Sequence, residues 1–148
     1  MGEASHDKRS EGETDLSSLF ASMAPKLHRE TFVFCTLSQN TIDPPVSDIL
    51  MRFREADETT LILPQTIADT RGFAYRGTWR MITLTVHSSL EAVGFLAKVL
   101  PSLATAGIST NVVSAFYHDH VFVQASRAQD ALSILQSLAS SRAMTQKP

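Results

Sequence analysis

The feature that most constrains the fold is the order of the predicted elements in the second half of the chain. In residues 79–86, aliphatic side chains alternate with methionine and threonine side chains, which predicts a strand with two different faces. Beyond them, the spacing of apolar residues predicts a helix, two strands and a second helix, over residues 90–103, 108–117, 120–124 and 126–138. The order β-α-β-β-α is that of a ferredoxin-like unit, βαββαβ, without its last strand.

Capping and turn residues predict where these elements begin and end. Ser88 and Glu91 have the spacing of a capping box, in which a serine oxygen accepts from an early helix N–H and the glutamate reaches back. The first helix is therefore expected to begin at this point, and Gly107 is expected to end it. His118 and Asp119 are expected to form the tight turn between the two strands.

The first half of the chain reads as a less regular copy of the same unit. Its composition predicts strands over residues 31–37, 49–54 and 59–63 and short helices over 15–23 and 64–71. Asp15 is expected to cap the first of these helices, and Gly72 is expected to stop the second. Residues 38–48 include two consecutive prolines and are expected to form a loop, so the long helix of the unit is missing there.

Two incomplete halves suggest that they share one sheet and exchange strands. The N-terminal strand would then take the place of the missing last strand of the second half. Residues 1–14 contain almost no apolar side chain and are expected to be a disordered tail. The expected organisation is this tail, a degenerate N-terminal half, a C-terminal half that is complete in its motifs, and a flexible C-terminal tail, over residues 1–14, 15–78, 79–141 and 142–148.

Composition excludes several classes of function. The 148 residues carry 13 Lys and Arg against 15 Asp and Glu, so the clustered positive charge that binds nucleic acid is absent. No apolar run has the roughly 20 residues of a membrane helix. A single cysteine, Cys35, cannot form an internal disulfide, which favours a reducing compartment. We therefore expect a cytoplasmic protein that binds neither nucleic acid nor membrane.

Several segments resemble a known family. The stretch Gly94–Ile108, GFLAKVLPSLATAGI, resembles the signature of ACT domains, the small-molecule-binding regulatory modules of amino-acid metabolism. Trp79–Phe95 and Asn111–Val123 look like a family of small tandem ACT-like proteins, as do Phe32–Leu37 and Met51–Glu55. The resemblance implies an α+β, ferredoxin-like fold whose two halves share an antiparallel sheet with helices on one face. A single layer of helices over a sheet with unpaired edges also predicts a homodimer or a higher closed assembly.

The resemblance further implies a ligand site. ACT modules typically pair side by side and bind an amino acid where the first β-α loop of one module faces the second strand of another. Carried over to this sequence, the loop consists of His87, Ser88, Ser89, Leu90, Glu91 and Gly94, and the strand side of Ile108, Ser109, Thr110 and Asn111. Backbone N–H groups at a helix start suit a carboxylate, since they lack intrahelical partners and lie at the positive end of the helix dipole.

Two departures from the family pattern limit this site. The first half lacks the long helix, so at most one well-formed site per chain is expected. Many ACT sequences have Asp and Pro before the glycine, whereas Ala92 and Val93 precede Gly94 here, so the ligand contacts differ.

The histidines allow alternative interpretations. His118, Asp119 and His120 together suggest a metal site, but a closed site needs about four ligands and no partner cluster is evident. A polar turn is the favoured interpretation, followed by a second site or a dimer contact. His87 either hydrogen-bonds a ligand or is satisfied locally at the end of its strand, and these two alternatives stay open.

Two further residues are weighed in the same way. Asn111 is a poor strand former and either donates to a ligand or ties two strands together. Cys35 lies in an apolar strand with no base nearby in sequence, which favours buried filler over a nucleophile.

The function predicted from the sequence is non-catalytic binding of a small amino acid or related carboxylate with a regulatory consequence. No cofactor and no metal is expected. The alternative is a ligand-free module for dimerisation or protein interaction. An enzyme that uses His87, His118 or Cys35 is the third and weakest hypothesis.

Overall fold

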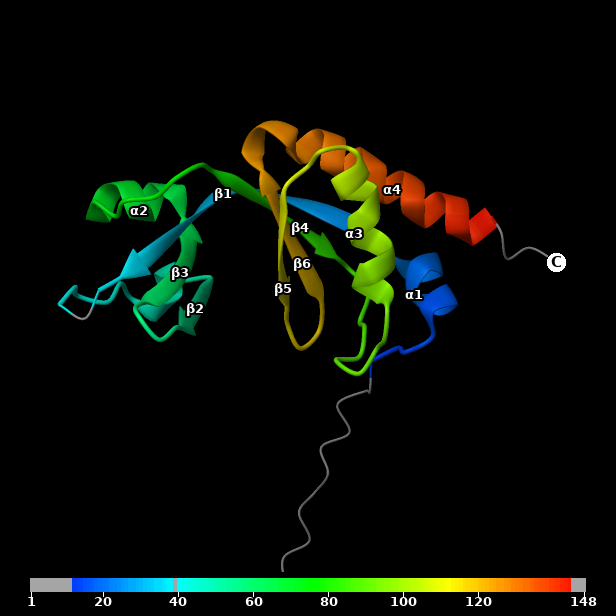
Figure 1. The fold of residues 1–148 in the computed structure, drawn as a ribbon, viewed down its shortest axis with the longest axis horizontal. Helices are drawn as coiled ribbons and strands as arrows, with labels where there is room; N and C mark the ends of the chain where they lie inside the picture. The colour runs from blue at the N-terminus through cyan, green and yellow to red at the C-terminus, as the bar shows by residue number, and fades with distance from the viewer. Residues whose placement is uncertain (1–11, 39, 145–148) are drawn as a thin grey trace, which may run out of the picture.

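A single six-stranded antiparallel sheet organises the chain, in the order β2-β3-β1-β4-β6-β5 (Figure 1). The computed structural model describes residues 12–38 and 40–144. The strands are β1 (Pro25–Leu37), β2 (Met51–Arg54), β3 (Thr59–Pro64), β4 (Trp79–Leu84), β5 (Thr110–Ser114) and β6 (Asp119–Gln124). The helices are α1 (Leu16–Ser22), α2 (Gln65–Arg71), α3 (Phe95–Thr105) and α4 (Ala128–Met144), with 3-10 turns at Val46–Asp48 and Ala125–Arg127.

The two halves exchange their first strands, as the sequence predicts. The N-terminal part of β1 pairs with β4, from Pro25 opposite Leu84 to Phe32 opposite Trp79. The C-terminal part of β1 pairs with β3. The order β1-β4-β6-β5 is therefore a complete ferredoxin-like sheet, in which β1 serves as the fourth strand of the second half. The order β2-β3-β1-β4 is the corresponding sheet of the first half, in which β4 serves as the fourth strand.

The helices cover one face of the sheet and form two cores with it (Figure 1). The larger core packs α1, α3 and α4 on β4 and β6, with Phe20, Leu103 and Leu135 among its fully buried side chains. The smaller core packs α2 on β1 and β3 and includes Ala68 and Cys35. This arrangement confirms the α+β, ferredoxin-like fold with helices on one face.

The other face of the sheet has its own apolar cluster. Phe32, Ile62, Met81 and Phe122 are buried there, because side chains alternate across each strand. The ring of Phe32 meets that of Phe122 edge to face, with centroids 5.9 Å apart. No helix of the described residues covers this face.

Several predicted boundaries are confirmed. Asp15 caps α1, its carboxylate accepting from the Ser18 N–H at 2.9 Å. Gly72 ends α2 in the left-handed conformation, with φ 71°. Gly107, with φ 68°, follows the end of α3.

The predicted start of the second-half helix is wrong. Ser88 to Glu91 form a loop, and α3 begins only at Phe95, after Gly94 with φ 84°. Ser88 makes a tertiary hydrogen bond, described below, in place of a cap. Leu90, counted in the helical stripe, is consequently 66% exposed.

The predicted turn between β5 and β6 is also displaced. The Ala115 N–H donates to the His118 carbonyl at 3.0 Å, so that Phe116 and Tyr117 form the tip. Asp119 belongs to β6 and is buried. The apolar character of the tip residues conceals the turn, because they resemble a continuing strand.

The expected tails differ partly from the structure. Residues 1–11 and 145–148 lie outside the described residues, but the helix α4 continues to Met144. Glu13 forms a β-bridge with Ser88: the Glu13 N–H donates to the His87 carbonyl at 2.9 Å, and the Ser89 N–H donates to the Glu13 carbonyl at 3.0 Å. A Cβ on Gly12 would lie 2.5 Å from the Ser89 nitrogen, so the chain approaches this loop closely.

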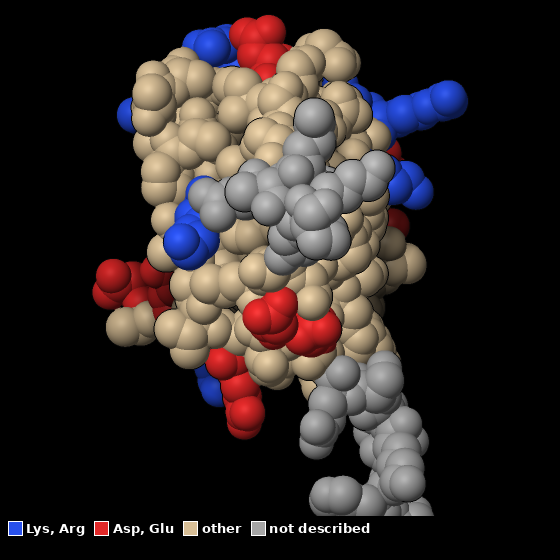
Figure 2. Space-filling view, turned by 90° about the vertical axis from the view of Figure 1, so that its right-hand side faces the viewer, with Lys and Arg blue, Asp and Glu red and all other residues tan. Residues whose placement is uncertain are grey.

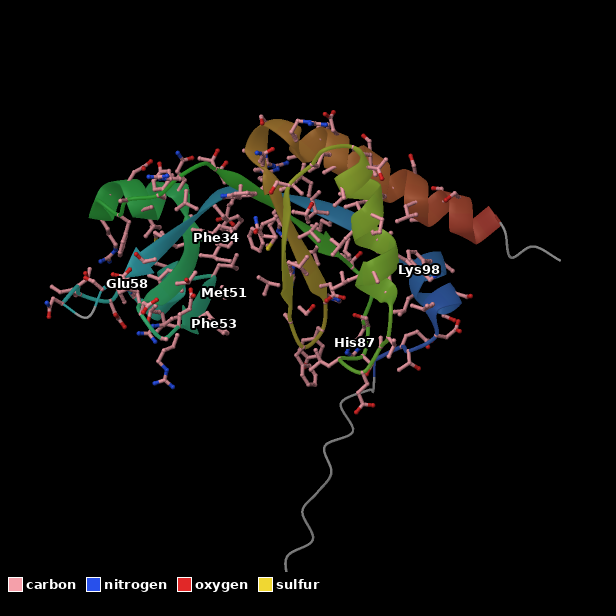
Figure 3. All side chains as sticks on the ribbon, in the orientation of Figure 1. Phe34, Met51, Phe53, Glu58, His87 and Lys98 are labelled. Atoms are coloured by element: carbon pink, nitrogen blue, oxygen red, sulfur yellow. The ribbon has the colours of Figure 1, made fainter. Side chains whose placement is uncertain are left out.

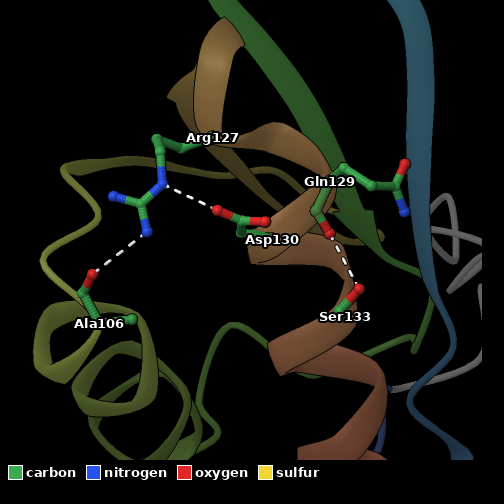
Figure 4. A network of polar contacts seen from close by, with 5 residues as sticks. All are labelled: Ala106, Arg127, Gln129, Asp130 and Ser133. Carbon is green, nitrogen blue, oxygen red and sulfur yellow. Dashed lines mark hydrogen bonds and ion pairs between the residues drawn. The ribbon is translucent and has the colours of Figure 1, made fainter.

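A polar network joins the two long helices (Figure 4). Arg127 donates through Nε to Asp130 at 3.0 Å and through Nη2 to the Ala106 carbonyl at 3.4 Å, beside the end of α3. Along α4 the Ser133 hydroxyl donates to the Gln129 carbonyl. The arginine fixes the start of α4 against the end of α3 and satisfies a carbonyl there.

Candidate ligand site

A pocket lies where the loop after β4 meets α3. It has a volume of about 170 Å³, and its walls are the loop from Ser88 to Ala92, the first turn of α3, the end of β5 and the start of β6. The antiparallel register brings these segments together, because Leu84 lies opposite Asp119, which in turn lies opposite Ser114. The pocket is therefore a consequence of the sheet topology.

Asp119 anchors this pocket. Its side chain accepts hydrogen bonds from the Ser88 hydroxyl at 3.0 Å and from the Ser114 hydroxyl at 2.5 Å. Only 7% of Asp119 is exposed. The loop, β5 and β6 are thus held together by one buried carboxylate that accepts from two hydroxyl donors.

The start of α3 supplies the opposite polarity. Gly94 caps the helix without a side-chain hydrogen bond, and the first intrahelical bond is from the Lys98 N–H to the Gly94 carbonyl at 3.2 Å. The N–H groups of Phe95, Leu96 and Ala97 therefore have no intrahelical acceptor. These three residues line the pocket, at the positive end of the helix dipole.

The structure brings together only part of the predicted site. Ser88, Ser89, Leu90 and Gly94 line the pocket, whereas Ile108, Ser109, Thr110 and Asn111 lie at the other end of β5. In one chain the predicted loop and the predicted strand start do not face one another. Asn111 is exposed on β5, opposite Phe122.

The two remaining loop residues make local contacts. The ring of His87 packs against that of Tyr117, with centroids 5.4 Å apart. Glu91 is exposed, and its N–H donates to the Ser89 hydroxyl at 3.2 Å. Neither side chain lines the pocket.

The three residues of the suspected metal cluster point to different surroundings. His118 donates through Nδ1 to the Val86 carbonyl at 3.2 Å, while Asp119 binds the two serines. His120 Nδ1 lies 2.9 Å from the Thr83 hydroxyl, on the open face of the sheet. Among the described residues, no three His, Cys, Asp or Glu side chains are placed to hold a metal ion.

Cys35 lies away from this pocket, in the smaller core. It is 4% exposed, and burial raises the pKa of its thiol. Its environment is that of a buried filler, because a nucleophilic cysteine needs a lowered pKa.

Sequence reasoning missed Ser114 and the first turn of α3 as parts of the pocket, and it placed Asp119 in the turn. The available signal was the alternation in β6: with Val121 and Val123 in the helix-side core, Asp119 is on the same side.

Comparison with known proteins identifies the family. Models of the ACT domain match residues 11–80 and 76–137 in tandem. The chain belongs to the ACT domain family, with two ACT units in one sheet. No curated protein matches this sequence.

Solved structures agree with this assignment. A Vibrio cholerae protein of unknown function, described as a possible transport protein, is 40% identical, with a TM-score of 0.70 over 84% of this chain and 95% of that one. A protein from Agrobacterium tumefaciens is 21% identical, with a TM-score of 0.62 over 79% of this chain and 89% of that one. The regulatory subunit of aspartate kinase from Thermus flavus shares the fold at 10% identity, with a TM-score of 0.56 over 78% and 97%.

Figure 2 shows Lys and Arg as scattered side chains on the end of the molecule that carries α1, with Asp and Glu among them. No described helix is both long enough and apolar enough to cross a membrane.

Proposed function

We propose that this protein is a non-catalytic regulatory module that binds a small amino acid or a related carboxylate in the pocket at the start of α3. The observation that carries the proposal is the pairing of free helix-start N–H groups with a buried carboxylate across one small pocket. The regulatory fold neighbours from aspartate kinase support it.

The polarity of the pocket matches the two charges of an amino acid. The N–H groups of Phe95, Leu96 and Ala97 are placed to bind the ligand carboxylate. Asp119 lies across the pocket and attracts the ligand ammonium. The volume of about 170 Å³ favours a small amino acid.

A homodimer in the cytoplasm completes the proposal. β5 is an edge strand, and no other strand of the described residues pairs with its outer side. A second copy pairing along this edge would bring its own Ile108–Asn111 segment toward the loop, as the family arrangement implies. The predicted strand residues would then act across the dimer interface.

The alternative function, a ligand-free interaction module, also has an observation in its favour. Val93 is 84% exposed and Leu90 is 66% exposed beside the pocket, and Phe116 is 53% exposed at the β5–β6 tip. Exposed apolar residues grouped in this way are typical of protein contacts. Ligand binding decides between the two functions.

The test uses Ala97→Glu. Ala97 is exposed, occupies the third position of α3 and lines the pocket, so a carboxylate there repels a ligand carboxylate while favouring the helix dipole. We expect calorimetry with the common amino acids to find a ligand for the unmodified protein. The affinity for that ligand should then fall at least tenfold in Ala97→Glu without loss of thermal stability.

Ala104→Glu is the matched control, because Ala104 is exposed on the same helix but outside the pocket. Gly94→Val is unsuitable as a probe, since the positive φ of 84° would strain valine regardless of any ligand. Equal ligand affinity in Ala97→Glu and Ala104→Glu would place the site elsewhere. If no amino acid of the panel binds the unmodified protein, the interaction module is the favoured function.

A further inference from the structure

A second cavity lies on the open face of the sheet, away from the helices, and shares only Ala115 with the pocket described above. Its volume is about 260 Å³, and its lining includes Met51, Met81, Val113, Ala115, His120 and Phe122. Met51 comes from β2 and Val113 from β5, the two edges of the sheet. The sheet curls so that both edge strands pack against one apolar cluster.

Aromatic and sulfur-containing side chains form the floor of this cavity. Phe122 is 1% exposed, and the ring of Phe34 meets it edge to face with centroids 5.6 Å apart. Figure 3 shows Phe34 and Met51 on the side that faces the space between the two halves. Thioether sulfurs such as those of Met51 and Met81 make favourable contacts with aromatic rings. The floor therefore suits a flat aromatic body.

One polar group lies at the wall of the cavity. His120 Nδ1 is 2.9 Å from the Thr83 hydroxyl, which is also 2.7 Å from His28 Nε2. The threonine proton can be donated to only one of the two rings, so the other ring donates its own N–H to the threonine oxygen. His120 Nε2 is then either an N–H donor or a lone-pair acceptor; the hydrogen bond of the ring to a described residue is through Nδ1. Because no buried side-chain nitrogen of the described residues lacks a partner, Nε2 is accessible to solvent or to a ligand.

We propose that this cavity binds a small neutral molecule with an aromatic body and one hydrogen-bonding group, of the chemical class of phenols and indoles. His120 Nε2 is the hydrogen-bond partner of that group. The lining contains no Lys, Arg, Asp or Glu, which disfavours a charged ligand. The site differs from the proposed amino-acid pocket: the two lie on opposite faces of the sheet and share only Ala115, directly after β5.

The test titrates indole into the ¹⁵N-labelled full chain and follows amide shifts by NMR. Val113→Phe fills the cavity from a half-buried position on β5 that lines this cavity and does not line the first pocket. We expect saturable shifts in β5 and β6 for the unmodified protein and for the control Ala104→Phe, and their loss in Val113→Phe. Absence of saturable shifts in the unmodified protein, or their persistence in Val113→Phe, overturns the proposal.

His120→Leu separates the polar contact from the apolar one. The Kd for indole should rise about tenfold, while the Kd for toluene, which has no hydrogen-bonding group, should not rise. An unchanged Kd for indole overturns the role of His120. Ala97→Glu should bind indole like the unmodified protein, so failure of the amino-acid proposal is distinguishable from failure of this one. If a second copy of the chain covers the cavity, light scattering gives a larger mass and indole does not bind. This outcome also overturns the proposal.

Discussion

The Ser88 side chain is held by a single carboxylate. Its hydroxyl donates to Asp119, and Ser88 itself is 7% exposed. Ser88→Ala removes one of two donors from a buried charged group, which should lower the free energy of unfolding by about 1–3 kcal/mol. Urea unfolding measures this loss.

Ser89→Ala is the control, because its hydroxyl bonds only the nearby Glu91 N–H in a partly exposed loop. We expect a loss below about 1 kcal/mol for this variant. Equal losses in the two variants would contradict the role assigned to Asp119.

The chain His28–Thr83–His120 predicts a pH dependence of stability. Burial lowers the pKa of His28 and of His120, and the neighbouring Lys26 and His118 lower them further, whereas Glu30 and Asp119 oppose this. The unfolded chain, with an ordinary pKa of about 6.5, therefore takes up protons before the folded protein does. Stability should fall as pH falls through 6.5.

The measurement is the urea midpoint at pH 7.5 and at pH 5.5, for the unmodified protein and for His120→Gln. The variant lacks one of the titrating rings and should lose less stability on acidification. A midpoint that rises on acidification in the unmodified protein would refute this account.

The sequence predicts which face of a strand a side chain lies on, but it does not predict the hydrogen-bond partner of that side chain. The alternation of Met81 and Thr83 with Ile82 and Leu84 correctly predicts the two faces of β4. The serine–glutamate spacing of a capping box, as at Ser88 and Glu91, can occur in a loop as well as at the start of a helix. Asp119, its actual partner, lies 31 residues away in the sequence, and only the tertiary register brings the two together.

At the scale of elements, the loop before α3 is braced by a segment that precedes α1. Glu13 bridges to Ser88, and the next residue but one, Asp15, caps α1. A chain that begins at Gly12 should match the full chain in thermal stability. A chain that begins at Asp15 should lose the two backbone hydrogen bonds and bind the amino-acid ligand more weakly.

Differential scanning calorimetry and ligand titration compare the two truncated chains. Equal Tm and equal affinity for both would show that the bridge contributes nothing to the loop.

Helix ends differ in how well the sequence predicts them. A left-handed glycine after a helix is a common stop signal, and Gly72 was predicted correctly. Glycine at a helix start is a weaker signal than serine, so the sequence pattern favoured Ser88 over Gly94. The apolar residues Leu90 and Val93 strengthened this error, because they continue the helical spacing while lying exposed in the loop.

At the scale of the whole molecule, β1 and β4 belong to both halves. A fragment of residues 79–141 lacks β1 and exposes the edge of β4 together with part of the larger core. We expect this fragment to aggregate or remain unfolded, whereas residues 12–144 fold cooperatively. Circular dichroism and thermal unfolding check this expectation, and a cooperative, monomeric fragment would contradict it.

The open edges of β2 and β5 predict association. We expect light scattering at micromolar concentration to give the mass of a homodimer, since an unpaired edge strand is a template for pairing with another chain. A monomeric mass that persists at higher concentration would contradict the shared ligand site.

Residues 72–78 connect α2 to β4. Their length therefore determines whether β1 pairs with β4 of its own chain or with β4 of a second chain. When this connection is long enough to turn back, the two halves of one chain interlock. A shortened connection leaves the same strand places to be filled by β4 of a second chain, and the product is a domain-swapped, intertwined pair with both cores unchanged. The choice between a self-contained chain and an intertwined pair thus depends on the length of one connection.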